Sequence, residues 1–123
     1  MAGIVFVRTE QLENITEFYL SRVGMRRWLH QPGIEILSKG SFIVGLQAKE
    51  QTDRDGLLTF VYESRREVDA AYERLKDVAL APPKQTEQYR IYNFFAMDPD
   101  DRRIEFQVFE HELPERPIFD WGE

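Results

Sequence analysis

One order of predicted elements occurs twice in the chain, and this repeat constrains the fold more than any single motif. Apolar spacing predicts a strand, a helix and then three strands in each half. In the first half these elements are expected at Ile4–Arg8, Leu12–Val23, Arg26–His30, Gly33–Ser38 and Ser41–Gln47. In the second half they are expected at Leu57–Tyr62, a helix beginning after Ser64, Lys84–Gln88, Arg90–Met97 and Arg103–Phe109.

The repeat predicts one domain at residues 1–110, with a tail at 111–123. Module one is expected at 1–48 and module two at 57–110, joined by the polar, turn-rich linker 49–56. A module of this size cannot bury both faces of its own sheet, so we expect it to pair with the second copy.

The last predicted strand carries a carboxylate between apolar residues. Ile104, Phe106 and Val108 alternate with a polar row of Arg103, Glu105 and Gln107. Successive side chains of a strand point to opposite faces, so Glu105 cannot share the buried face of Phe106. Such a polar row is typical of a sheet face that lines a cleft and equally of one that meets water, and the strand alone leaves both readings open.

Composition excludes several classes of function. The formal net charge is −6, and the Lys and Arg residues are scattered, so no basic stripe for nucleic acid is present. The absence of cysteine excludes disulfides and thiolate metal sites. No apolar run approaches the roughly 20 residues of a membrane span. We therefore expect a soluble cytoplasmic protein with no nucleic-acid or membrane partner.

Two segments resemble a known family. The segment "ITEFYLSRVGM" is similar to a family helix that ends in an aromatic pair before a glycine, and "DPDDRRIEF" is similar to the family's DPDG-x-x-IE hairpin. The family that both segments resemble is the vicinal oxygen chelate superfamily of glyoxalases, bleomycin resistance proteins and extradiol dioxygenases. The resemblance implies an α+β fold in which two βαβββ modules form a U-shaped mixed-sheet cleft. Asp101 stands where the family usually has glycine, and aspartate tolerates the left-handed backbone of such a turn.

The metal ligands of the family are largely missing. The resemblance places four ligand positions at Ile4, near Gly45, near Leu57 and at Glu105, and only Glu105 carries a strong donor. Gln47 and Thr59, one step along the same faces, are poor ligands for a divalent ion. We therefore predict no metal and no cofactor.

Strand parity together with the resemblance predicts the lining of the cleft. The candidate ligand-binding residues are Phe6, Arg8, Gln47, Thr59, Arg103, Glu105 and Gln107. An arginine beside Glu105, either Arg8 or Arg103, would keep the carboxylate ionised. The same pair could instead be a buried ion pair that closes a small barrel without any ligand.

The first functional hypothesis is a metal-free protein of the glyoxalase/bleomycin-resistance type that holds a small organic ligand in the cleft between its modules. The alternative is a divergent enzyme, a lyase, isomerase or dioxygenase, in which Glu105 acts as metal ligand or general base. A third hypothesis is an interaction module of a larger assembly. The apolar tail residues Ile118, Phe119 and Trp121 also predict a homodimer.

Overall fold

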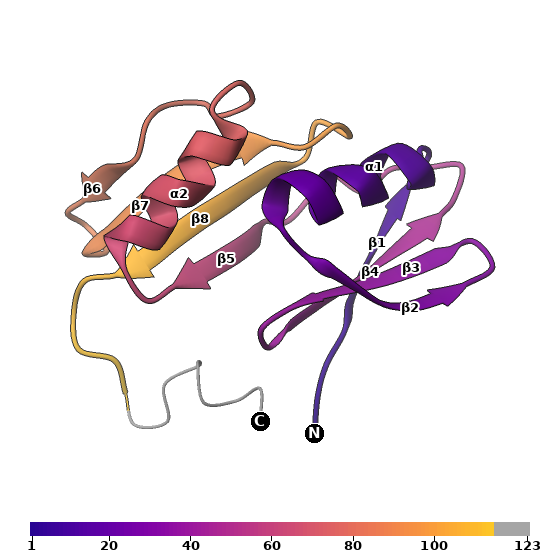
Figure 1. Cartoon of the computed structure of the whole chain (residues 1–123), viewed down its shortest axis with the longest axis horizontal. Helices are drawn as coiled ribbons and strands as arrows, with labels where there is room; N and C mark the ends of the chain where they lie inside the picture. Colours follow the sequence, from indigo (N-terminus) through magenta and orange to yellow (C-terminus); the bar gives the residue numbers. More distant parts are fainter. Residues whose placement is uncertain (115–123) are drawn as a thin grey trace. The chain divides into compact units, whose positions relative to one another are not determined.

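The structure is a computed structural model that describes residues 1–114. The chain divides into two compact units, one containing residues 1–54 and the other beginning at Asp55. Each unit is a βαβββ module (Figure 1), and this confirms the predicted α+β fold. The tail residues on which the homodimer prediction rests, 118, 119 and 121, lie outside the described part of the chain.

The first module contains a four-stranded sheet in the order β1-β4-β3-β2. β1 runs parallel to β4, and the other neighbours are antiparallel. Gly24 ends the helical segment in the left-handed conformation, with φ of 88°, as its position predicts. The elements are β1 (Val5–Thr9), α1 (Leu12–Phe18), its π-helical continuation η1 (Tyr19–Val23), β2 (Arg26–Gln31), β3 (Ile34–Lys39) and β4 (Phe42–Ala48).

The second module repeats this arrangement in the order β5-β8-β7-β6. The Oγ atom of Ser64 accepts a hydrogen bond from the backbone N–H of Glu67 at 3.3 Å, so the predicted cap begins the helix. The strand predicted to reach Gln88 ends at Thr86, because the chain turns before Arg90, whose φ is 51°. The elements are β5 (Leu58–Tyr62), α2 (Arg65–Leu75), β6 (Lys84–Thr86), β7 (Ile91–Met97) and β8 (Arg103–Phe109).

The two modules also share the register of their sheets. β1 pairs with β4 from Val5↔Val44 onward, and β5 pairs with β8 from Leu58↔Ile104 onward, in both cases over five residue pairs. The corresponding cross-strand rows are Phe6, Gly45 and Ile36 in the first sheet and Thr59, Glu105 and Phe95 in the second. The internal repeat predicted from the sequence is therefore present at the level of individual residue pairs.

The core of the second module is an aromatic stack under α2. Phe106 stacks on Phe60 and on Phe94, with ring centroids 5.1 Å and 5.0 Å apart. Tyr72 of α2 meets Phe94 edge-on at 5.5 Å, so α2 covers this face of the sheet (Figure 1). Phe94 of β7 belongs to this core, whereas Tyr89, in the turn before β7, is 61% exposed.

The first module packs in the same way. Ile15 of α1 and Leu37 and Leu46 of the sheet are fully buried, and α1 lies on β3 and β4 (Figure 1). None of the helices within residues 1–114 combines the length and apolar character needed to span a membrane.

Candidate ligand-binding site

Glu105 lies in the middle of β8 on the face of the second sheet that α2 leaves uncovered. Its side chain is only 7% exposed. Thr59 Oγ1 donates a hydrogen bond to Oε1 of Glu105 at 3.0 Å, and Asn93 Nδ2 donates one to Oε2 at 2.9 Å. Thr59 is the register partner of Glu105 on β5, and Asn93 is its diagonal neighbour on β7. Two uncharged donors therefore hold the carboxylate from the two neighbouring strands.

The amide of Asn93 is itself held in place. Thr86 Oγ1 of β6 donates a hydrogen bond to Asn93 Oδ1 at 2.8 Å. With its oxygen engaged there, the amide of Asn93 must present its NH₂ group to Glu105. The chain of hydrogen bonds runs across all four strands of the second sheet, and it fixes the orientation of Glu105 before any ligand arrives.

An aromatic ring lies beside this carboxylate. Phe95 is the register partner of Glu105 on β7, shares its face, and is half-buried. The guanidinium carbon of Arg103 is 5.0 Å from the centroid of the Phe95 ring, which is a cation–π distance. Of the two readings left open by the sequence, the one in which Arg103 forms an ion pair with Glu105 is not observed, because Arg103 covers Phe95 and both hydrogen-bond partners of Glu105 in the described chain are neutral.

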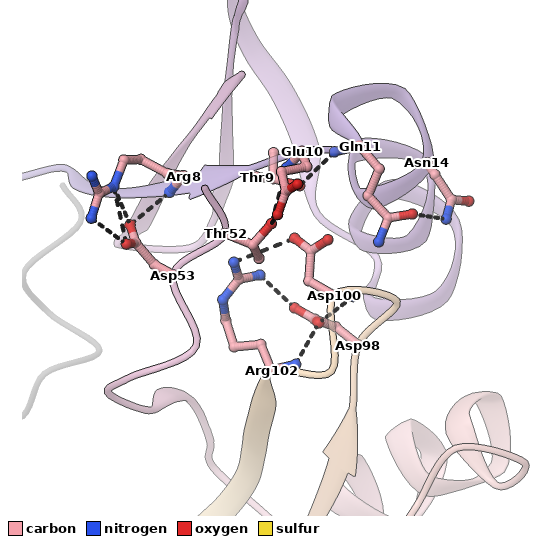
Figure 2. A network of polar contacts seen from close by, with 10 residues as sticks. All are labelled: Arg8, Thr9, Glu10, Gln11, Asn14, Thr52, Asp53, Asp98, Asp100 and Arg102. Carbon is pink, nitrogen blue, oxygen red and sulfur yellow. Dashed lines mark hydrogen bonds and ion pairs between the residues drawn. The ribbon is translucent and has the colours of Figure 1, made fainter. Parts of the chain in front are cut away.

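The other predicted partner, Arg8, is engaged inside the first module. Its Nη2 is 2.7 Å from Oδ1 of Asp53, and its backbone N–H donates to Oδ2 of the same carboxylate at 2.8 Å (Figure 2). Hydrogen bonding to Asp53 raises the pKa of the Arg8 guanidinium above its ordinary value. Arg8 therefore serves to tie the segment after β4 to β1, and the predicted linker is in part fastened to the first module.

The corresponding row of the first sheet is apolar. The ring of Phe6 lies against Gly45, and a Cβ atom at position 45 would lie 2.4 Å from two ring carbons. Gly45 is thus required for this close approach, and Phe6 remains 49% exposed. Gln47, the next residue of β4 on this face, is half-buried. The row offers an apolar surface and no charged group at the position equivalent to Glu105.

The donor set does not fit a divalent metal. Within residues 1–114, no group of three or more His, Asp or Glu side chains is placed to hold a metal ion. His30 Nδ1 is hydrogen-bonded to Glu35 at 2.7 Å, and His111 Nδ1 lies 2.9 Å from the carbonyl oxygen of Glu112. A single carboxylate offsets little of the dehydration cost of such an ion.

Sequence reasoning missed two residues of this site, Asn93 and Phe95. Asn93 stands in an apolar strand that suggests no role for it, and the aromatic character of Phe95 predicts a core residue. The signal that could have found them is the register of the β7–β8 hairpin. Pairing the two strands around the DPDD turn places Phe95 opposite Glu105 and Asn93 opposite Gln107, all on the uncovered face.

Comparisons with known proteins agree on the fold. No protein-family model matches the chain, and no curated protein matches it. Among solved structures, a glyoxalase/bleomycin resistance protein/dioxygenase from Nocardioides is 20% identical, with 95% of this chain and 89% of that chain covered and a TM-score of 0.73. An integron cassette protein from the mobile metagenome of a Halifax Harbour sewage outfall is also 20% identical, with 89% and 98% covered and a TM-score of 0.76.

A lactoylglutathione lyase from Agrobacterium tumefaciens is 16% identical, with 88% of this chain and 92% of that chain covered and a TM-score of 0.72. Sequence identities this low show a common fold and leave the activity open. The α+β fold of two βαβββ modules, implied by the two resembling segments of the sequence, is confirmed.

Proposed function

We propose, from the glyoxalase/bleomycin resistance/dioxygenase fold of this chain, that the protein binds a small organic molecule on the face of the second sheet that carries Glu105. The observation that supports this most directly is the buried carboxylate of Glu105, oriented by Thr59 and Asn93 beside the half-buried ring of Phe95. Apolar surface supplies affinity in such sites, and a few oriented polar groups supply specificity. That the ligand lies in a cleft between the modules stays a prediction.

A divergent enzyme is the second candidate, because one structure of the same fold is named a lactoylglutathione lyase and another a glyoxalase/bleomycin resistance protein/dioxygenase. In that case Glu105 would act as a general base on a carbon acid, since its donors leave acceptor capacity on both oxygens.

The homodimer and the cytoplasmic location also remain proposals. A sedimentation mass equal to one chain at micromolar concentration would reject the homodimer.

Binding on the proposed face can be tested before the natural ligand is identified. A fragment library would be screened by two-dimensional NMR of the ¹⁵N-labelled protein. We expect binding fragments to shift the backbone amides of Thr59, Asn93, Phe95 and Glu105 and to leave the exposed end of α2 near Glu73 unchanged. A screen in which no fragment shifts the four site amides contradicts the proposed function.

Metal content separates the metal-free hypothesis from a metal-dependent enzyme. Because Ile4, Gly45 and Leu57 stand at the other ligand positions implied by the family, we expect the purified protein to carry no stoichiometric divalent metal. The measurement is elemental analysis after expression in metal-supplemented medium. A stoichiometric amount of Zn, Ni, Mn or Fe that resists dialysis would contradict the prediction and favour the second candidate.

A further inference from the structure

The buried carboxylates of the described chain differ in the charge of their partners. Four of them, Glu35, Asp98, Asp100 and Glu105, have buried side chains. Glu35 lies 2.8 Å from Arg27 Nε and 2.7 Å from His30 Nδ1. Asp98 and Asp100 lie 2.7 Å and 3.4 Å from the guanidinium nitrogens of Arg102. Glu105 alone in this set accepts hydrogen bonds only from uncharged groups, Thr59 and Asn93.

The consequence of a charged partner is visible at Glu35. Burial alone would raise the pKa of the Glu35 carboxyl, but hydrogen bonds and charge from Arg27 and His30 outweigh burial and lower it. Buried carboxylates are rarely left without such a partner, because desolvation of an unpaired charge is expensive. In the described chain, Glu105 receives hydrogen bonds from two neutral groups and from no cation, so a cationic ligand could supply the charged partner that Glu35 has within the protein.

Glu105 also has room for another partner. A carboxylate offers about four acceptor positions, and Thr59 and Asn93 occupy one on each oxygen. The neighbouring Arg103 could have supplied the missing cation from two residues away, but its guanidinium covers the ring of Phe95. The register of β7 and β8 places the half-buried ring of Phe95 next to the Glu105 carboxylate on the same face of the sheet.

We propose that the ligand is an organic cation, with an ammonium or amidinium group that binds Glu105 and an apolar or aromatic body that packs against Phe95. This inference rests on the proposed function and names the class of ligand for the same face. An anionic ligand would be repelled by Glu105. A divalent metal would need ligands that the described residues do not supply.

Benzylammonium, benzyl alcohol and benzoate form a matched set of probes, because they share a phenyl ring and differ in charge. Their affinities would be measured by NMR titration, following the amides of Thr59, Asn93 and Glu105. We expect benzylammonium to bind at least about tenfold more tightly than benzyl alcohol, which corresponds to one charged hydrogen bond. In the Glu105→Gln variant this preference should disappear.

The outcomes separate the two proposals. Benzyl alcohol or benzoate binding on this face as tightly as benzylammonium would overturn the cation proposal and leave the proposed function standing. Unperturbed amides at Thr59, Asn93 and Glu105 with benzylammonium would also overturn the cation proposal. The fragment screen decides independently whether the face binds anything at all.

A stability measurement tests the unpaired charge without any ligand. Glutamine at position 105 keeps the shape of the side chain, and its amide oxygen and NH₂ group can still meet Asn93 and Thr59. We expect Glu105→Gln to leave the melting temperature unchanged or to raise it. The matched variant Glu35→Gln should lower it, because it removes a paired charge. Equal losses in the two variants would show that the protein itself compensates Glu105, and would overturn the proposal.

Discussion

Replacing Arg102 by alanine is expected to lower the free energy of unfolding by about 3–5 kcal/mol, the cost of breaking a buried ion pair from one side. Arg102 is 1% exposed, and its guanidinium pairs with Asp98 and Asp100 at 2.7 Å and 3.4 Å (Figure 2). Asp98 also accepts the backbone N–H groups of Asp100 and Arg102, both at 2.9 Å. The variant would remove the guanidinium that pairs with these two buried carboxylates, in the turn that joins β7 to β8.

Urea denaturation followed by circular dichroism measures this effect. Arg103→Ala is the matched control, because Arg103 is the next residue and is exposed. Its cation–π contact with Phe95 is worth about 0.5–1 kcal/mol at an exposed site. Equal losses for the two variants would contradict the assignment of Arg102 as the central partner of the turn.

The sequence predicted the repeat and the strand faces because both depend on local alternation. Glu105 and Phe106 had to point to opposite faces of the sheet, and the structure places Phe106 in the aromatic stack under α2 and Glu105 on the other face. The turn around Asp101 was also predictable. Its φ of 62° is the left-handed conformation that aspartate tolerates where the family has glycine.

The partners of charged groups were not predictable in this way. Three arginines that look alike in the sequence have different partners. Arg8 binds Asp53, Arg102 is buried against two aspartates, and Arg103 covers the ring of Phe95. Which partner each arginine contacts depends on segments far apart in the chain and on the geometry of a turn. Periodicity carries no information on either, so the sequence could not show that Arg103 contacts Phe95 and leaves Glu105 to neutral partners.

Phe106→Ala is expected to lower the free energy of unfolding by about 3–5 kcal/mol through the cavity it creates. Phe106 is fully buried at the centre of the aromatic stack, with Phe60 and Phe94 on either side. Neither neighbouring ring can fill the space without leaving its own packing against the sheet. The measurement is again urea denaturation, with Phe109→Ala as control, because Phe109 lies near the end of β8 and is only half-buried.

Phe106→Leu extends this test to binding. It keeps an apolar side chain in the core, so the variant should fold with a smaller loss of stability than Phe106→Ala. Phe106 and Glu105 lie on opposite faces of β8. We therefore expect the Phe106→Leu variant to bind benzylammonium as tightly as the unmodified protein does. The Glu105→Gln variant should instead lose affinity for benzylammonium without losing stability. A tenfold loss of affinity in Phe106→Leu would show that the two faces of this strand do not separate packing from binding.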